Sequence, residues 1–453
     1  MFLLKFLMFI ASLFAIYPLS KFIRKDEINI FDFIILFHTL FFCFVPIVSN
    51  YSDFQWLKGF LFEEGIIFRV FIFYTIFITC FFITDLFWTK HYKYRNSILN
   101  ITYYIKTRSQ IHVSWFFLFF LFINLIISWV WYLPKASIFD NLQEYSNSQG
   151  FVRSPLYLFY GSIFLLCFSF SLILYLKEKL SIKKTNILLI ILVGYTLILF
   201  FLPRRTLLFY LILSLIIVYS IKRDFFSVKK ILMIFVILYI IIKIYFPFYN
   251  IMRRSDVKFD SNNFTTSLIH IVEKAKHDFN SKKDAAARSS EGRALNLYYA
   301  LYRIVKYDKS PNNGELFIIA IDHALPKLIN PNKGNGTEVM LQEKMLCKTD
   351  QADSILLLAY ADFGLFLGAF YAFSLFVLLI WVHCFIHIIS ISIFNYGSTI
   401  NILLIINLIS ISWNVETKLD AYFASLVTLP IMTILLMLLS RFKIVGYKMI
   451  SLK

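Results

Sequence analysis

The sequence predicts an all-α polytopic integral membrane protein with about eleven transmembrane helices and one large extracytoplasmic loop. Of its 453 residues, 59% are hydrophobic and only 16% are charged, against ~25% in an ordinary soluble domain. A water-soluble fold of this length cannot bury so much apolar surface, and the composition also excludes a disordered chain. The apolar runs are long and do not alternate with polar residues, which favours helices over strands.

Eleven apolar runs are long enough to be considered as spans, because a helix needs ~20 apolar residues to cross ~30 Å of hydrocarbon. They are 2–19, 28–48, 66–88, 113–133, 155–176, 187–202, 206–221, 231–249, 362–389, 399–415 and 422–440. The two short runs beside Pro203 also fit a single helical hairpin. The first run lacks a small-residue cleavage site, so we expect it to be retained rather than removed as a signal peptide.

Basic residues in the loops indicate the orientation. With the N-terminus outside, the inner connections and the C-terminal tail hold twenty lysines and arginines, and the short outer loops hold six. This is the asymmetry that the positive-inside rule expects, so the N-terminus is predicted outside and the C-terminus inside. The net charge of +18 is then explained by membrane-flanking residues, and no nucleic-acid partner is implied.

Residues 250–353 differ from the rest of the chain, since they form a polar stretch that contains 16 basic and 13 acidic residues. Long loops in compact proteins are usually functional or disordered, and a periodic helical pattern from Ser290 to Val305 favours an ordered cap. The predicted organisation therefore has three parts: spans one to eight in 1–249, the outer loop in 250–353, and spans nine to eleven with the tail in 354–453.

Arginines supply the first candidate site. Arg204 and Arg205 follow Pro203 in a tight turn between two apolar spans, on the side that is poor in cations. Guanidinium groups bind phosphate through a bidentate fork, so this pair suits an anionic lipid headgroup. The alternative is ordinary snorkelling of arginine towards phospholipid.

A second candidate is the helix predicted from Ser290, whose Arg293, Asn296 and Arg303 share one polar face beside Glu291. A capped helix start beside arginines suits an anion such as pyrophosphate. Spacing alone also fits an amphipathic interfacial helix with a solvated basic face, and favours it.

Further polar residues occur later in the chain. His323, a candidate general base, and Lys333, a candidate phosphate contact, lie in a loop rich in proline and glycine. Asp362 stands at the start of the ninth predicted span, where a carboxylate is costly enough to suggest a partner such as an arginine. His383 and His387 lack a third ligand, and the five cysteines have no metal spacing. We therefore expect no metal and no cofactor.

These features together resemble a known family. The long outer loop between late spans, the arginine turn after the sixth span, the Leu-Pro-to-Asn-Pro-x-Lys loop at 325–333 and Tyr-Ala-Asp-Phe-Gly at 360–364 carry the resemblance. The sequence is similar to bacterial O-antigen or oligosaccharide repeat-unit polymerases of the Wzy type, which are related to the O-antigen ligases. The specific similarity covers the second half of the chain.

The resemblance implies a GT-C-like, inverting and metal-independent glycosyltransferase in the bacterial inner membrane, with a periplasmic N-terminus and a cytoplasmic C-terminus. Its implied partners are undecaprenyl-pyrophosphate-linked oligosaccharides as donor and acceptor, the lipid bilayer and a chain-length regulator. Carried over by position, the pyrophosphate-binding role falls on Arg205, with Arg204, and on Arg293. Glu291 or His323 would accept the proton of the acceptor hydroxyl.

Other classes of protein fit the same spans. An O-antigen ligase shares the donor but transfers to lipid A-core, and a lipid-linked oligosaccharide flippase or another transporter would move the same lipid. A membrane-bound acyltransferase is a third alternative, with only the histidines in its favour.

Overall fold

The computed structural model describes the helical parts of the chain and a few isolated positions. The described residues are 2–40, 43, 63–89, 99–108, 115–132, 155–177, 180–201, 204–241, 266, 269–270, 273, 299–307, 311–324, 336–344, 354–394, 397–413, 419 and 422–423. All regular elements within these ranges are helices, and none of the ranges contains a strand. The all-α prediction is therefore confirmed.

Ten of the eleven predicted spans contain a helix. They are α1 (Phe2–Ser12) continued by η1 (Leu13–Ala15) and α2 (Ile16–Arg24), α3 (Ile30–Thr39), α5 (Glu64–Thr89), α8 (Trp115–Tyr132), α10 (Pro155–Lys177), α11 (Ile182–Phe201), α12 (Arg204–Ile221), α13 (Val228–Ile240), α19 (Phe366–Phe394) and α20 (Gly397–Trp413). Most of the eleventh, 422–440, lies outside the described residues. Within the described ranges, four helices are long and apolar enough to cross a membrane, at Lys5–Arg24, Glu64–Trp88, Ile182–Leu199 and Phe366–Ile388. The protein is an integral membrane protein, and the count of eleven spans stays a prediction.

The chain divides into two compact units, which we describe separately. Unit 1 comprises 1–101, 291–395 and 404–427, and unit 2 comprises 102–290, 396–403 and 428–453. These two units are defined by contacts between residues. The three-part division with boundaries at 249 and 353 is defined by predicted membrane topology, which contacts do not test. That division therefore stays a prediction.

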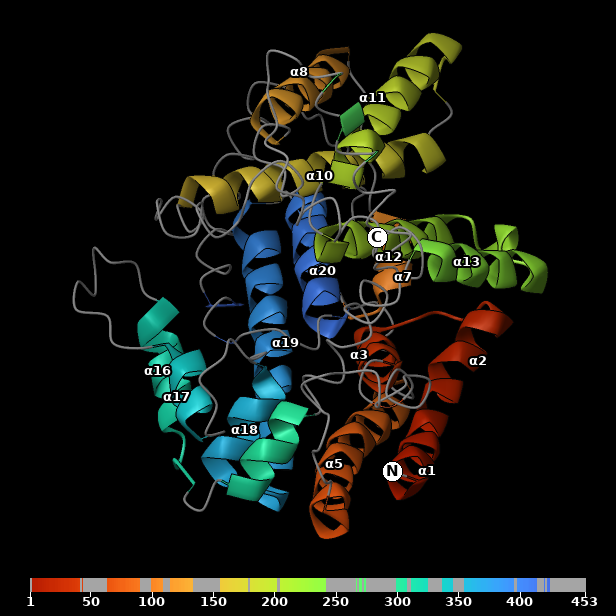
Figure 1. The fold of residues 1–453 in the computed structure, drawn as a ribbon. Coiled ribbons are helices and arrows are strands. Elements are labelled where there is room, and N and C mark those ends of the chain that lie inside the picture. Colours follow the sequence, from red (N-terminus) through yellow and green to blue (C-terminus); the bar gives the residue numbers. More distant parts are fainter. Residues whose placement is uncertain are drawn as a thin grey trace. The chain divides into compact units, whose positions relative to one another are not determined.

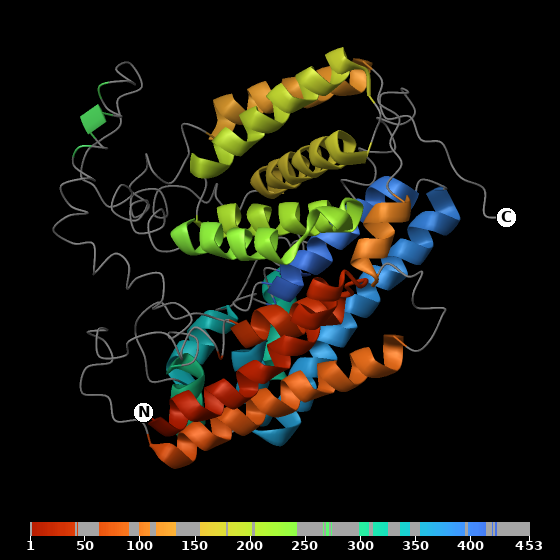
Figure 2. The same ribbon diagram turned by 90° about the vertical axis from the view of Figure 1, so that its right-hand side faces the viewer.

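Unit 2 contains α8, α10, α11, α12 and α13 together with α7 (Ile101–Arg108) and η5 (Arg223–Phe225). Helices α8 and α11 lie side by side (Figure 2), and α10 packs against both and against α12. A buried hydrogen bond joins the first pair, since Tyr195 Oη donates to Asn124 Oδ1 over 2.7 Å. Helices in lipid associate through close packing and such interhelical hydrogen bonds.

Unit 1 is built around α5, which packs against α1, α3 and α19. Phe77 and Phe81 of α5 are fully buried and meet aromatic rings of α19. The ring centroids of Phe81 and Phe373 lie 4.9 Å apart, and those of Phe77 and Phe376 lie 5.7 Å apart. These tilted and edge-on contacts make α5 and α19 the aromatic core of the unit.

The predicted span 362–389 does not begin at Asp362, so its first boundary was wrong. The helix breaks after Phe363, and the long helix α19 begins at Phe366. A separate helix, α18 (Ile355–Phe363), begins where Ser354 Oγ accepts the Leu357 N–H over 3.2 Å. It ends at Gly364, whose φ of 72° lies in the left-handed region that favours glycine. Asp362 thus lies in the last turn of α18, before the membrane-spanning α19.

The packing of α18 against α19 depends on Gly368. A Cβ atom at this position would lie 2.7 Å from the backbone oxygen of Ala359, which cannot move without shifting α18. Gly368→Ala is therefore expected to lower the free energy of unfolding by about 1–3 kcal/mol, the usual cost of overpacking. Thermal unfolding in detergent measures this loss. Gly65→Ala is the matched control, since a Cβ there meets nothing within 4 Å; an equal loss in both variants would contradict the account.

Candidate functional site

Helix α5 carries polar partners at both of its ends and apolar packing between them. Glu63, just before its first residue, and Asp85, near its last turn, are separated by roughly 33 Å at 1.5 Å per residue. This separation is close to the ~30 Å thickness of the hydrocarbon core. The two ends of unit 1 therefore offer two different polar sites.

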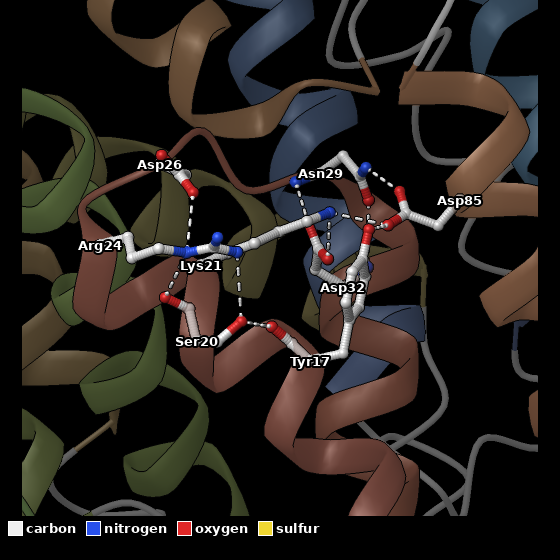
Figure 3. Close-up of polar contacts among 8 residues, drawn as sticks. All are labelled: Tyr17, Ser20, Lys21, Arg24, Asp26, Asn29, Asp32 and Asp85. Atoms are coloured by element: carbon white, nitrogen blue, oxygen red, sulfur yellow. Dashed lines mark hydrogen bonds and ion pairs between the residues drawn. The ribbon is translucent and has the colours of Figure 1, made fainter.

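The first site is the Lys21 cluster, formed by Tyr17, Lys21, Asn29, Asp32 and Asp85 (Figure 3). Lys21 Nζ lies 2.8 Å from Asp32 Oδ1 and 2.7 Å from Asp85 Oδ2. Tyr17 Oη donates to Asp85 Oδ2 over 2.7 Å, and the side-chain amide of Asn29 donates to Asp85 Oδ1. The Asn29 backbone N–H donates to Asp32 Oδ2 over 3.0 Å. Each of the four carboxylate oxygens of Asp32 and Asp85 therefore has a hydrogen-bond or ion-pair partner. The cluster holds α2, the start of α3 and the end of α5 together.

Local sequence explains how the Lys21 cluster forms. Asn29 caps α3, and its side chain accepts the Asp32 N–H in a capping box. Lys25 ends α2 at a φ of 62° and turns the chain back towards α3. This cluster was not predicted from the sequence, in which Lys21 counted only as one of the twenty inner basic residues that indicate orientation. The available signal was the occurrence of Asp32 and Asp85 inside apolar runs, where charges are rare and usually paired.

The second site lies at the Glu63 end of unit 1, where the described residues of the polar stretch 250–353 form helices. These are a helix over 299–307, α16 (Glu315–Ala324) and α17 (Thr337–Lys344). Helices α16 and α17 contact each other and α18, beside the start of α19 (Figure 1). The helix predicted from Ser290 to Val305 is confirmed from residue 299 onwards, and 290–298 lie outside the described residues.

Arg303 is a predicted site residue that lies at the Glu63 end and within the described residues. Its Nη1 donates to Tyr299 Oη over 3.0 Å, and its guanidinium carbon lies 5.6 Å from the Tyr299 ring centroid and 5.3 Å from that of Tyr307. Stacking on tyrosine rings orients a guanidinium group and lowers the entropy lost when it binds a ligand. The group is half-buried, so part of it still faces solvent.

The helix over 299–307 is attached to the start of α5. Tyr302 is fully buried, and its Oη accepts the backbone N–H of Glu63 over 2.7 Å. Lys306 Nζ lies 2.6 Å from Glu63 Oε1, and this hydrogen bond raises the pKa of Lys306. These contacts fix Arg303 relative to the membrane-spanning helices of unit 1.

Asp362, in the last turn of α18, is fully buried beside the first residues of α16. Its Oδ1 accepts the Leu316 N–H over 3.1 Å, and its backbone oxygen accepts the Asn313 N–H over 2.9 Å. Burial raises the pKa of Asp362 to about 6, against the opposing effect of the backbone N–H groups of Leu316 and Phe317. The carboxyl group is therefore mostly ionised at neutral pH, and it stabilises the N-terminus of α16.

The other predicted site residues are only partly described. His323 lies in the last turn of α16, and its ring lies against Gly336, where a Cβ atom would be 3.4 Å from the ring. Glu291, Arg293, Asn296 and Lys333 lie outside the described residues. Arg204 and Arg205 open α12 in unit 2, but their side chains are not described. Arg303, His323 and Asp362 share unit 1, and the predicted pairing of Asp362 with an arginine stays a prediction.

His383 of α19 shows polar contacts of its own. Its Nδ1 lies 2.7 Å from the backbone oxygen of Leu379 and 2.8 Å from Tyr422 Oη. Within the described parts of the chain, no group of three or more histidine, cysteine or carboxylate side chains could hold a metal ion.

Comparisons with known proteins give one match. The family model described as O-antigen polysaccharide polymerase Wzy matches residues 2–326. The search of curated proteins and the search of solved structures each found no match. The matched region includes the arginines at 204, 205, 293 and 303, and ends before Lys333 and Asp362. It begins at the first span, whereas the sequence analysis placed the resemblance in the second half of the chain.

Proposed function

Because the chain belongs to the O-antigen polysaccharide polymerase Wzy family, we propose that it joins oligosaccharide repeat units carried on undecaprenyl pyrophosphate into a surface polysaccharide. The observation that carries this proposal is the family match over most of the chain. The apolar helices of the protein are consistent with lipid-linked substrates.

In the proposed reaction, the bond between the anomeric carbon of the donor glycan and the pyrophosphate oxygen breaks. A hydroxyl oxygen at the non-reducing end of another lipid-linked unit forms the new bond from the opposite face, so the anomeric configuration inverts. The hydroxyl proton passes to a base of the protein, and undecaprenyl pyrophosphate leaves. Negative charge that develops on pyrophosphate is stabilised by guanidinium groups held in position, without a metal ion.

The residues of the outer loop and of α12 supply these groups in the proposal. Arg205, with Arg204, and Arg293 hold the pyrophosphate, and Glu291 or His323 accepts the proton. Asn296, Arg303, Lys333 and Asp362 contact the substrate. The orientation of Arg303 between two tyrosine rings supports a binding role for this face of the helix over 299–307.

The proposed location is the bacterial inner membrane, with the N-terminus periplasmic and the C-terminus cytoplasmic. The Glu63 end of unit 1 would then face the periplasm, where lipid-linked units are presented, and the Lys21 cluster would lie towards the cytoplasm. The distribution of basic residues supports this orientation. A chain-length regulator is a further proposed partner at the periplasmic face.

Surface polysaccharide from a strain lacking the protein tests the proposal. Loss of a polymerase leaves single repeat units attached to the acceptor and removes the ladder of longer chains. Loss of a ligase instead leaves polymer accumulating on undecaprenyl pyrophosphate, and loss of a flippase leaves repeat units on the cytoplasmic leaflet. Gel profiles, with the lipid-linked fraction analysed beside them, separate the three outcomes, and only the first supports the proposal.

A further inference from the structure

The contact between α16 and α18 contains two buried polar atoms without a hydrogen-bond partner among the described residues. They are Asp362 Oδ2 and Asn312 Nδ2. Two backbone hydrogen bonds join the segment before α16 to the end of α18. The Asn312 N–H donates to Ala361 O over 3.1 Å, and the Asn313 N–H donates to Asp362 O over 2.9 Å. We name this structure the Asp362 junction and define it as Asn312, Asn313, Leu316, Ala361 and Asp362.

Leaving a buried donor or acceptor unsatisfied costs about 1–3 kcal/mol, so native proteins rarely keep such atoms without a reason. The two atoms here are complementary. An ionised Asp362 Oδ2 only accepts hydrogen bonds, and an amide Nδ2 only donates them. A hydroxyl group does both, so one hydroxyl can donate to Asp362 Oδ2 and accept from Asn312 Nδ2.

The surroundings suit a sugar. Phe363 and Tyr371 pack edge to face with ring centroids 4.6 Å apart, and Phe317 contacts the same tyrosine ring. Small-molecule sites commonly combine aromatic walls with a few placed polar groups. Two charged side chains act on Asp362 from neighbouring helices, Lys344 of α17 and Glu315 of α16.

The exposed side of the junction is at Asn312 and its neighbours. Asn312 itself is half-buried, and its neighbours Pro311 and Asn313 are exposed. Asp362 is fully buried. Asn312 and its exposed neighbours are therefore the part of the junction nearest to solvent.

We propose that the Asp362 junction binds one sugar hydroxyl of a lipid-linked repeat unit, held between Asp362 Oδ2 and Asn312 Nδ2. This inference rests on the proposed polymerase function and adds Asn312 as a specificity-determining residue. Its role is to bind the sugar, so the loss of Asn312 should weaken binding and leave the chemical step nearly unchanged.

Initial rates of chain growth in proteoliposomes test this role. The substrate is the lipid-linked repeat unit extracted from a strain that lacks the protein, supplied over a range of concentrations. Asn312→Ala is expected to raise the apparent KM about tenfold, with kcat within about twofold, because one buried hydrogen bond is lost. Asn312→Ser keeps a donor and should raise KM less.

A paired exchange sharpens the test. Asp362→Asn keeps an oxygen for the Leu316 N–H but places an amide donor towards Asn312, so the apparent KM should rise at least tenfold. The double variant Asn312→Asp with Asp362→Asn restores one donor and one acceptor, and should return KM to within about threefold of the wild-type value. Ser374→Ala is the control, because Ser374 lies on α19 outside the junction and its exposed hydroxyl bonds only to the backbone oxygen of Phe370.

An unchanged KM in Asn312→Ala, with or without a lower melting temperature, would overturn the inference and assign the junction to a bound water molecule. Failure of the exchange to restore KM would overturn it as well. A folded wild-type protein that builds no polymer would instead refute the proposed function, and with it this inference.

Discussion

Lys21→Ala should strongly destabilise the protein. Lys21 is buried between Asp32 and Asp85, with Nζ within 2.8 Å of one carboxylate oxygen from each. Removing the ammonium group leaves two buried carboxylates close together without their shared cation. Breaking a buried ion pair by removing one partner typically costs about 3–5 kcal/mol, and the like charges add to that cost. We expect a much lower melting temperature in detergent and a reduced amount of protein in the membrane.

Two comparisons isolate the cause. Arg24→Ala is the control, because the Arg24 side chain is exposed, pairs with Asp26 over 3.4 Å and belongs to the same helix. It should change the melting temperature little. Adding Asp85→Asn to Lys21→Ala removes one of the two like charges and should recover part of the lost stability. If the two substitutions lower stability additively, the carboxylates do not interact as described.

Arg205→Ala and Arg293→Ala should each abolish long-chain polysaccharide. In the proposed function these side chains stabilise the charge that develops on the leaving pyrophosphate. Removing one such donor typically lowers kcat by about 100- to 1000-fold. We expect single repeat units in place of the ladder, with the protein still present in the membrane at its normal level.

Lysine replacements refine this prediction. Arg205→Lys and Arg293→Lys keep the charge but lose the bidentate fork, so they should restore only short chains. Arg24→Ala again serves as the control and should give a normal ladder. Normal ladders in both alanine variants would remove these arginines from the mechanism.

Much of the fold could be predicted because span formation depends on local hydropathy. Helices α8, α10 and α12 of unit 2 begin and end within two residues of the predicted spans. The break before α19 could not be predicted in this way, since 355–394 is one nearly continuous apolar run. The break depends on the positive φ of Gly364 and on the close approach of Gly368 to Ala359.

Polar partners were harder to predict, because they come from distant parts of the chain. Lys21 and Asp85 are 64 residues apart, and a basic residue near the end of a span is usually only a marker of orientation. Asn312 stands in a polar loop where asparagine is common, and it becomes informative only when its backbone hydrogen bond to Ala361 is known. Hydropathy carries no information about such pairings.

The most direct test of the polymerase function is chain growth by the purified protein. Reconstituted into proteoliposomes with its lipid-linked repeat unit and a metal chelator, the wild-type protein is expected to produce a ladder that grows in steps of one repeat unit and releases undecaprenyl pyrophosphate. If the protein remains folded by its melting temperature but the repeat units stay single, with or without added divalent cations, the proposed function is contradicted.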